Sequence, residues 1–416
     1  LRNQEGCTSY LSAISNTMPA YNHISVAVPA LAELKAMPRL IDCLRRQTFK
    51  AFALYVCVNN SDHWWTDGNP DHKAMADENM ALIEYLNTIN DIDITIIDKA
   101  TPGHGWTGKR HGVGWARKLL LDTIAEQRGD DELIVSMDAD THFDCGYLPA
   151  AIEAMNNDVG LWAIAVPYYH PLDDIGADDE CRAILRYEIY MRYYMLQLMR
   201  IASPYAFTAL GSAMVFSAGA YRRVGGVTPL QGGEDFYLMQ KLAKAGRIST
   251  CLRTCVYPSA RASHRVPFGT GPAVGKTLDD QERSYPFYPS DIFDRVGQTF
   301  DSFPALYHAD CPTPMTTFLQ QQLRTTALWQ PMRANYKRPE LFVRACAQRV
   351  DGLRILQYLR NEYAQYPSGS STSYLIEYCR ADGIDIDDNF SFATTPIEVI
   401  NALRNALFDK EMLLRR

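Results

Sequence analysis

Residues 132–147 read ELIVSMDADTHFDCGY, an apolar run that ends abruptly at two aspartates. Residues 133–135 have the apolar and largely β-branched character of a buried strand. Asp138 and Asp140 follow this strand directly, at the edge where open α/β sheets bind their ligands. The stretch therefore predicts an α/β sheet that carries an acidic site at the end of one strand.

The spacing of the two aspartates favours a bound cation. In an extended backbone, residues i and i+2 point the same way, and so we expect Asp138 and Asp140 to converge. Two carboxylates that close repel each other unless a cation or a proton lies between them. A hard divalent ion, Mg²⁺ or Mn²⁺, prefers oxygen ligands and leaves positions open for phosphate oxygens. The alternative is a turn at the strand end with two solvated aspartates.

The first two thirds of the chain alternate strand patterns with helix patterns. Strand patterns cover residues 23–28, 52–58, 92–97, 161–166 and 213–216, in addition to the strand before Asp138. Helix patterns cover residues 34–47, 75–86, 112–125, 148–155 and 180–201. Regular alternation of this kind implies βαβ units and a mainly parallel sheet flanked by helices.

From about Cys311 onward the pattern is helical. Helices are predicted over residues 316–328, 339–363, 373–381 and 396–414, with no convincing strand between them. Residues 263–290 are rich in Gly, Pro and aromatic residues, which indicates an irregular loop over the site. We therefore divide the chain into an N-terminal extension (1–20), an α/β domain (21–270), an irregular loop (271–310) and a helical C-terminal region (311–416).

The composition excludes several classes of function. A net charge of −7 argues against a nucleic-acid partner, because no basic excess is present to displace counterions. No apolar run approaches the roughly 20 residues that span a bilayer, so we expect a cytoplasmic protein. Basic residues in the last helix leave peripheral contact with an anionic membrane open, although its acids dilute their charge. Ten cysteines in 416 residues do not make a disulfide scaffold, and we expect reduced thiols.

A second acidic motif, GGEDF, occupies residues 232–236 and opens a helix pattern that ends at Gly246. The glycines permit close backbone approach and unusual backbone angles. Glu234 and Asp235 would then lie at a helix N-terminus, where the helix dipole favours ionised carboxylates. A carboxylate there can act as a general base towards an incoming hydroxyl. Simple capping of the helix by two acids is the alternative.

Taken in order, these motifs resemble the nucleotide-diphospho-sugar transferases of the GT-A fold, most closely glycosyltransferase family 2. The resemblance covers roughly residues 22–265. It consists of PALAE at 29–33, a polar turn at 59–62, Ala116-Arg117, the DxD motif, the strand at 211–216 with Gly225-Gly226, and Glu234-Asp235. It implies a metal-dependent, hexosyltransferase-like enzyme that moves a sugar from a nucleotide-diphospho-sugar donor to an acceptor hydroxyl. The acceptor, a glycan, a lipid or a small molecule, stays open.

The resemblance also assigns roles to individual residues. Binding of the nucleotide sugar is assigned to Pro29, Glu33, Asn59, Asn60, Asp62, Arg117, Asp138 and Arg265. Asp140, Asp138 and His264 would bind the metal, and an imidazole ligand suits Mn²⁺ better than Mg²⁺. Asp235 would be the catalytic base of an inverting displacement, and Glu234 would orient the acceptor.

Three alternatives remain at this stage. A retaining GT-A enzyme is the nearest one, because a late-loop histidine such as His264 also occurs as a metal ligand in retaining families. A sugar nucleotidyltransferase would normally carry a glycine-rich, basic signature after the first strand, which residues 29–35 (PALAELK) lack. A non-catalytic sugar-nucleotide binder would not need both acidic motifs. The family usually has an aspartate where Asn59 and Asn60 stand, which leaves the preferred nucleobase open.

Overall fold

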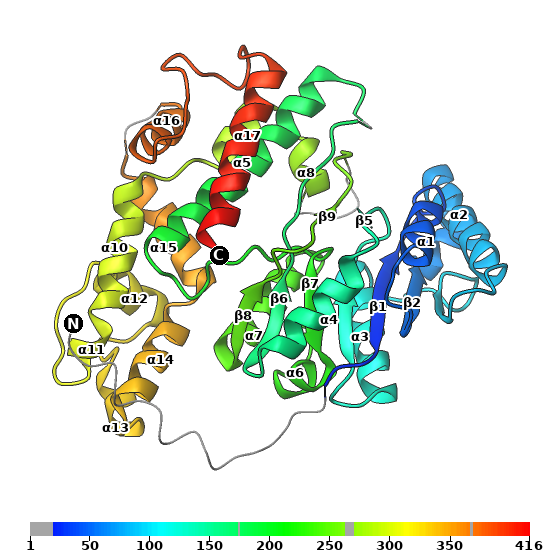
Figure 1. Ribbon diagram of the computed structural model, residues 1–416, viewed down its shortest axis with the longest axis horizontal. Helices are drawn as coiled ribbons and strands as arrows, with labels where there is room; N and C mark the ends of the chain where they lie inside the picture. Colours follow the sequence, from blue (N-terminus) through cyan, green and yellow to red (C-terminus); the bar gives the residue numbers. More distant parts are fainter. Residues whose placement is uncertain (1–19, 174, 263–269, 367–368) are drawn as a thin grey trace.

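The computed structural model describes residues 20–173, 175–262, 270–366 and 369–416 (Figure 1). Its centre is a seven-stranded sheet with strand order β3-β2-β1-β4-β7-β6-β8. The strands are β1 (Ile24–Ala30), β2 (Phe52–Asn59), β3 (Ile94–Lys99), β4 (Leu133–Ser136), β6 (Leu161–Ala165), β7 (Met214–Ser217) and β8 (Arg247–Thr250). Neighbouring strands are parallel except at β7, which is antiparallel to both β4 and β6. The predicted α/β class with a mainly parallel sheet is confirmed.

Helices cover both faces of this sheet, which explains why the central strands are apolar on both sides. One face packs against α1 (Met37–Arg45), α2 (Pro70–Asn87) and α4 (Tyr147–Asn157). The other packs against α3 (Val113–Gln127), α6 (Ala218–Arg223) and α7 (Glu234–Ala245). Within β1, Val26 and Val28 contribute to the first core and Ala27 to the second. A short 3₁₀ helix, η1 (Asp62–Trp65), follows β2.

The position of β1 determines where a ligand site can form. β1 lies between β2 and β4, so the order of strand addition reverses between β1 and β4. In open α/β sheets, ligands bind in the crevice outside the carboxyl ends of the strands at such a switch point. The small antiparallel sheet of β5 (His142–Phe143) and β9 (Val256–Tyr257) joins the segment after the DxD motif to the segment before residue 258.

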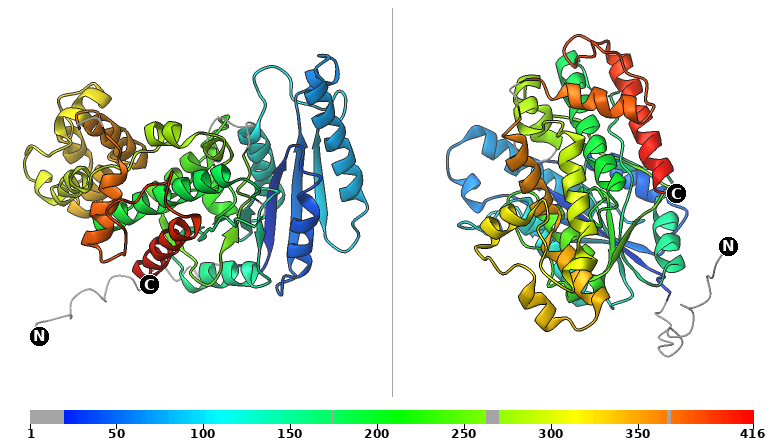
Figure 2. Two further views of the ribbon diagram at one scale, coloured as in Figure 1. Left: turned by 90° about the horizontal axis from the view of Figure 1, so that it is seen from above. Right: turned by 90° about the vertical axis from the view of Figure 1, so that its left-hand side faces the viewer.

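A second apolar core organises the C-terminal region around the long helix α5 (Asp178–Arg200). Figure 2 shows these helices gathered on one side of the sheet. They are α8 (Thr270–Val274), α9 (Leu278–Ser284), α10 (Ser290–Asp301), α11 (Phe303–Leu306), α12 (Thr316–Leu323), α13 (Gln330–Asn335), α14 (Pro339–Arg349), α15 (Gly352–Tyr363), α16 (Thr372–Ala381) and α17 (Ile397–Leu414). The last helix, α17, lies alongside α5 (Figure 1). None of the helices formed by the described residues has the length and apolar character needed to cross a bilayer.

Two sequence-based predictions in this region are wrong. Residues 271–310 form helices α8–α11 instead of an irregular loop. The reason is packing, because Ile292, Phe293 and Val296 of α10 are fully buried in the second core. The single helix predicted over residues 339–363 is divided in two. Asp351 caps the second part, where its side chain accepts a 3.0 Å hydrogen bond from the Arg354 amide.

Candidate active site

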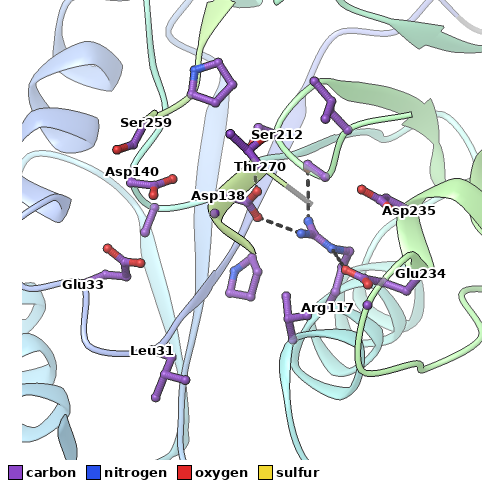
Figure 3. A pocket seen from close by; sticks show the side chains of 18 of the residues that line it. Leu31, Glu33, Arg117, Asp138, Asp140, Ser212, Glu234, Asp235, Ser259 and Thr270 are labelled. Carbon is purple, nitrogen blue, oxygen red and sulfur yellow. Dashed lines mark hydrogen bonds and ion pairs between the residues drawn. The ribbon is translucent and has the colours of Figure 1, made fainter. Parts of the chain in front are cut away.

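A cavity of about 390 Å³ lies at the switch point, between the carboxyl ends of β1 and β4 and helices α5 and α7 (Figure 3). The fold brings the two acidic motifs to it, one after a strand and the other at a helix start. Of the predicted site residues, those that line the cavity are Pro29, Glu33, Asn59, Arg117, Asp138, Asp140, Glu234 and Asp235. Its walls also include Tyr187, Met191, Ser212, Arg261 and Thr270.

The DxD motif is not extended. The Thr141 amide donates a 3.2 Å hydrogen bond to the Asp138 carbonyl, which makes a turn of the motif. Asp138 accepts hydrogen bonds from Arg117 Nη2 at 2.7 Å and from Ser212 Oγ at 2.6 Å. Asp140 instead forms an ion pair with Arg261, with 3.1 Å between Oδ2 and Nη2. The extended backbone on which the expected convergence of the two carboxylates was based is therefore absent, and each carboxylate pairs with a different arginine.

Arg117 of α3 connects the two acidic motifs. It is only 2% exposed, and Nε donates a 3.0 Å hydrogen bond to Glu234 Oε1. Nη1 donates to Ser136 Oγ at 2.5 Å and to the Gly211 carbonyl at 3.1 Å, while Nη2 binds Asp138. Burial opposes the charged form of Arg117, but the carboxylates of Asp138 and Glu234 outweigh it and raise the pKa. Every guanidinium nitrogen is thus engaged within the protein, whereas the sequence predicted a contact with the nucleotide sugar.

Two glycines are required by this arrangement. A Cβ at Gly211 would lie 2.4 Å from Arg117 Nη2, so no side chain fits there unless the arginine moves. Gly233 has φ of 77°, in the left-handed region that favours glycine, and it immediately precedes α7. Together they allow Arg117 to reach Glu234 and allow the chain to turn into α7 at the cavity.

Asp235 faces the cavity from the first turn of α7 (Figure 3). Burial and the neighbouring charge of Glu234 raise the pKa of Asp235 to about 7. The positive charge of Arg117 and a hydrogen bond from the Phe236 amide, 2.7 Å from Oδ1, act in the opposite direction. A carboxylate whose pKa lies near neutrality can accept a proton from a substrate hydroxyl under physiological conditions.

The residues predicted to border a nucleoside divide into two groups. Asn59 lines the cavity, but its amide donates to the Ala30 carbonyl at 2.9 Å and accepts from Trp106 Nε1 at 3.1 Å. Asn60 and Asp62 are not among the lining residues. Asn60 is buried and accepts a hydrogen bond from Asn79, and Asp62 accepts one from the Gly103 amide at 2.7 Å. These two side chains support the loops behind the cavity. His264 and Arg265 lie outside the described residues.

Sequence reasoning missed several polar residues of the site. Asn79 of α2 is fully buried, and its Oδ1 accepts a 2.8 Å hydrogen bond from the Ala32 amide. Ala32 has φ of 52°, so Asn79 holds the loop after β1 in an unusual backbone conformation. A lone Asn within an otherwise regular helix pattern is only a weak indication that its side chain has a structural role. Nothing in the local sequence distinguishes Arg261 or Ser212, because their partners are distant in the chain.

The donor set is compatible with a divalent cation that is completed by its substrate. Within the described ranges, no group of three or more His, Cys, Asp or Glu side chains is arranged to hold a metal. Asp138 and Asp140 nevertheless bring carboxylates to the cavity, and the Arg261 guanidinium already lies against Asp140. Mg²⁺ and similar ions commonly bind through one or two carboxylates together with substrate phosphates and water. A metal that is held by the protein alone would need more ligands than these.

No protein-family model and no curated protein sequence matches the chain. Among solved structures, residues 1–349 of TarS from S. aureus in complex with UDP-GlcNAc are 14% identical, with a TM-score of 0.40 over 90% of this chain and 98% of that one. The mannosyltransferase PcManGT from Pyrobaculum calidifontis, in complex with GDP-Man and Mn²⁺, is 14% identical, with a TM-score of 0.38 over 94% and 86% of the two chains.

Glucosyl-3-phosphoglycerate synthase from Mycobacterium tuberculosis, in complex with Mn²⁺, UDP and glucosyl-3-phosphoglycerate, is 15% identical. Its TM-score is 0.36 over 67% of this chain and 80% of that chain. Similarity at this level assigns neither a family nor an activity.

Proposed function

We propose that this protein is a glycosyltransferase that moves a sugar from a nucleotide-diphospho-sugar to an acceptor hydroxyl, with inversion at the anomeric carbon. One observation carries the proposal: a single cavity at the switch point joins a DxD motif to a carboxylate, Asp235, whose pKa is raised to about 7. The first group suits a diphosphate with its cation, and the second suits removal of a hydroxyl proton.

The donor half of the cavity is formed by the loops after β1 and β4. Asp140 would bind a divalent cation, with Asp138 beside it, and the cation would neutralise charge on the departing nucleoside diphosphate. Asp138 is held in place by Arg117 and Ser212. Because these bonds fix its orientation, Asp138 is preorganised on the donor side before any ligand binds.

The acceptor half lies between α5 and α7, where Tyr187 and Met191 of α5 line the cavity together with the second acidic motif. Asp235 accepts the proton of the acceptor hydroxyl while the acceptor oxygen attacks the anomeric carbon. The bond from that carbon to the diphosphate oxygen breaks, and its electron pair leaves on the diphosphate. Attack from the face opposite the leaving group inverts the configuration, and a single base is sufficient for this step.

The first experiment finds the donor. Thermal-shift measurements with UDP-GlcNAc, UDP-Glc and GDP-Man, each with and without Mn²⁺, identify the nucleotide sugar that stabilises the protein. Sugar transfer is then followed by release of the nucleoside diphosphate for the wild type and for the variants Asp140→Ala and Asp235→Asn. Asp409→Asn is the matched control, because this exposed aspartate of α17 does not line the cavity.

We expect Asp235→Asn to lose transfer by roughly a factor of 10² to 10⁴ and to keep nucleotide binding, since the base acts on the acceptor. We expect Asp140→Ala to lose the Mn²⁺-dependent part of nucleotide binding. Wild-type transfer rates in both variants would show that the assignment is wrong. The anomeric configuration of the product, measured by NMR, separates inversion from the retaining alternative.

A further inference from the structure

Arg261 occupies a place in the cavity that the proposed reaction does not yet use. It follows β9, and its Nη2 lies 2.5 and 2.6 Å from the two carboxylate oxygens of Glu33. The same nitrogen lies 3.1 Å from Asp140 Oδ2. Glu33 follows β1 and Asp140 follows β4, so one guanidinium bridges the two sides of the switch point.

This bridge provides positive charge where two acids meet. The Glu33 side chain is 9% exposed and the Asp140 side chain 22% exposed, so their charges are only partly screened by water. Arg261 compensates them through charge-assisted hydrogen bonds. A divalent cation bound at Asp140 would have the same electrostatic effect. Because both cations would use the same carboxylate, binding of one opposes binding of the other.

The guanidinium also has the means to change partners. Its side chain is 40% exposed, and the ion pairs described above use Nη2. Arg261 Nε is buried and has no hydrogen-bond partner among the residues that the structure describes. Arginine has five N–H donors in a planar fork that matches phosphate oxygens. A guanidinium released from Asp140 would therefore remain in the donor half of the cavity with donors available.

We propose that Arg261 is a diphosphate-binding residue that neutralises Glu33 and Asp140 until the donor arrives. Asp140 would then hold the cation of the incoming nucleotide sugar, and the released guanidinium would bind the phosphate oxygens. The inference rests on the proposed function, because it assigns Arg261 to the leaving group of that reaction. It predicts that Arg261 weakens binding of the free cation and strengthens binding of the nucleotide.

The test compares Arg261→Gln and Arg261→Lys with the wild type. Binding of Mn²⁺ alone is measured by electron paramagnetic resonance, and binding of UDP and GDP at saturating Mn²⁺ by calorimetry. For Arg261→Gln we expect tighter binding of Mn²⁺ alone, by about two- to fivefold for a partly exposed ion pair. We expect weaker nucleotide binding, by roughly tenfold to a hundredfold for hydrogen bonds to a charged group.

Arg261→Lys keeps the charge and loses the fork, so both shifts should be smaller. Arg253→Gln is the matched control, because Arg253 pairs with Glu153 and does not line the cavity. Tighter binding of Mn²⁺ together with weaker binding of the nucleotide distinguishes this role from a structural one. If Arg261 were only structural, its replacement would weaken the binding of both ligands. Unchanged or weaker binding of Mn²⁺ alone by Arg261→Gln overturns this inference. The proposed function still stands in that case if the wild-type enzyme transfers sugar. Failure of the wild type to bind any nucleotide overturns the proposed function as well.

Discussion

Arg117 Nε donates a 3.0 Å hydrogen bond to Glu234 Oε1, and this bond ties α3 to the first residue of α7. Glu234 is buried and forms an ion pair with Arg117. Asp235, the next residue, faces the cavity with a pKa raised to about 7. Arg117 therefore pairs with one of two adjacent acids, Glu234, which has a structural role. The other acid, Asp235, faces the cavity and can accept a proton.

This relationship predicts that Arg117 is required for stability as well as for activity. Replacement by Met leaves Glu234 buried without its cation and removes a partner of Asp138. Breaking a buried ion pair in this way costs about 3–5 kcal/mol. We expect a loss of this size in the free energy of unfolding of Arg117→Met, measured by urea denaturation. Arg110→Met, at an exposed position on the loop before α3, is the control. A loss below about 1 kcal/mol, typical of an exposed pair, would contradict the network.

The pKa of Asp235 predicts the pH dependence of transfer. A base acts in its ionised form, so the turnover number should rise with pH as Asp235 loses its proton near pH 7, and then level off. Initial rates at saturating donor and acceptor, measured from about pH 5 to about pH 9, report this transition. A profile that is already flat at the acidic end would mean that another group accepts the proton.

The same pKa has a consequence for stability, with the opposite sign. The pKa of Asp235 rises from 3.8 to about 7 on folding, so the folded state binds more protons between these values. Protonated Asp235 is therefore favourable to folding, and this contribution is lost as the pH rises through 7. Each unit of pKa difference corresponds to about 1.4 kcal/mol. We expect Asp235→Asn to raise the melting temperature, by more at pH 8 than at pH 5. A substitution that changes the melting temperature by the same amount at both pH values would contradict this prediction.

Gly211 predicts a steric test of the same network. A Cβ at position 211 would lie 2.4 Å from Arg117 Nη2 and 3.4 Å from Asp138 Oδ2. Gly211→Ala should therefore displace the arginine, at a cost of about 1–3 kcal/mol for overpacking a filled site. Gly176→Ala is the control, because nothing lies within 4 Å of its added Cβ. Thermal unfolding and transfer rates measure both effects. Wild-type values for Gly211→Ala would show that Arg117 can move at little cost.

Local signals in the sequence located the main elements of the site well. The apolar run before Asp138 forms β4, and the glycine pair before Glu234 leads into α7 as predicted. Both predictions depend on neighbouring residues, because side-chain periodicity and glycine act on the local backbone. The helices between residues 270 and 306 were not predicted. Three of them, α8, α9 and α11, have seven residues or fewer, so local propensity alone does not stabilise them. Their apolar residues gain stability from tertiary packing, in the second core for α9–α11 and in a smaller cluster with α5 for α8.

The sequence by itself determined the alternation of strands and helices, and it put Asp138, Asp140 and Asp235 at the ends of elements. These features follow from residues close together in the chain. Only the tertiary structure decided which acidic residue pairs with which arginine. Arg117 reaches Glu234, and Arg261 reaches Asp140. The physical reason is that strand order and helix packing set distances between residues that are far apart in the chain, and the strength of an ion pair depends on that distance and on burial.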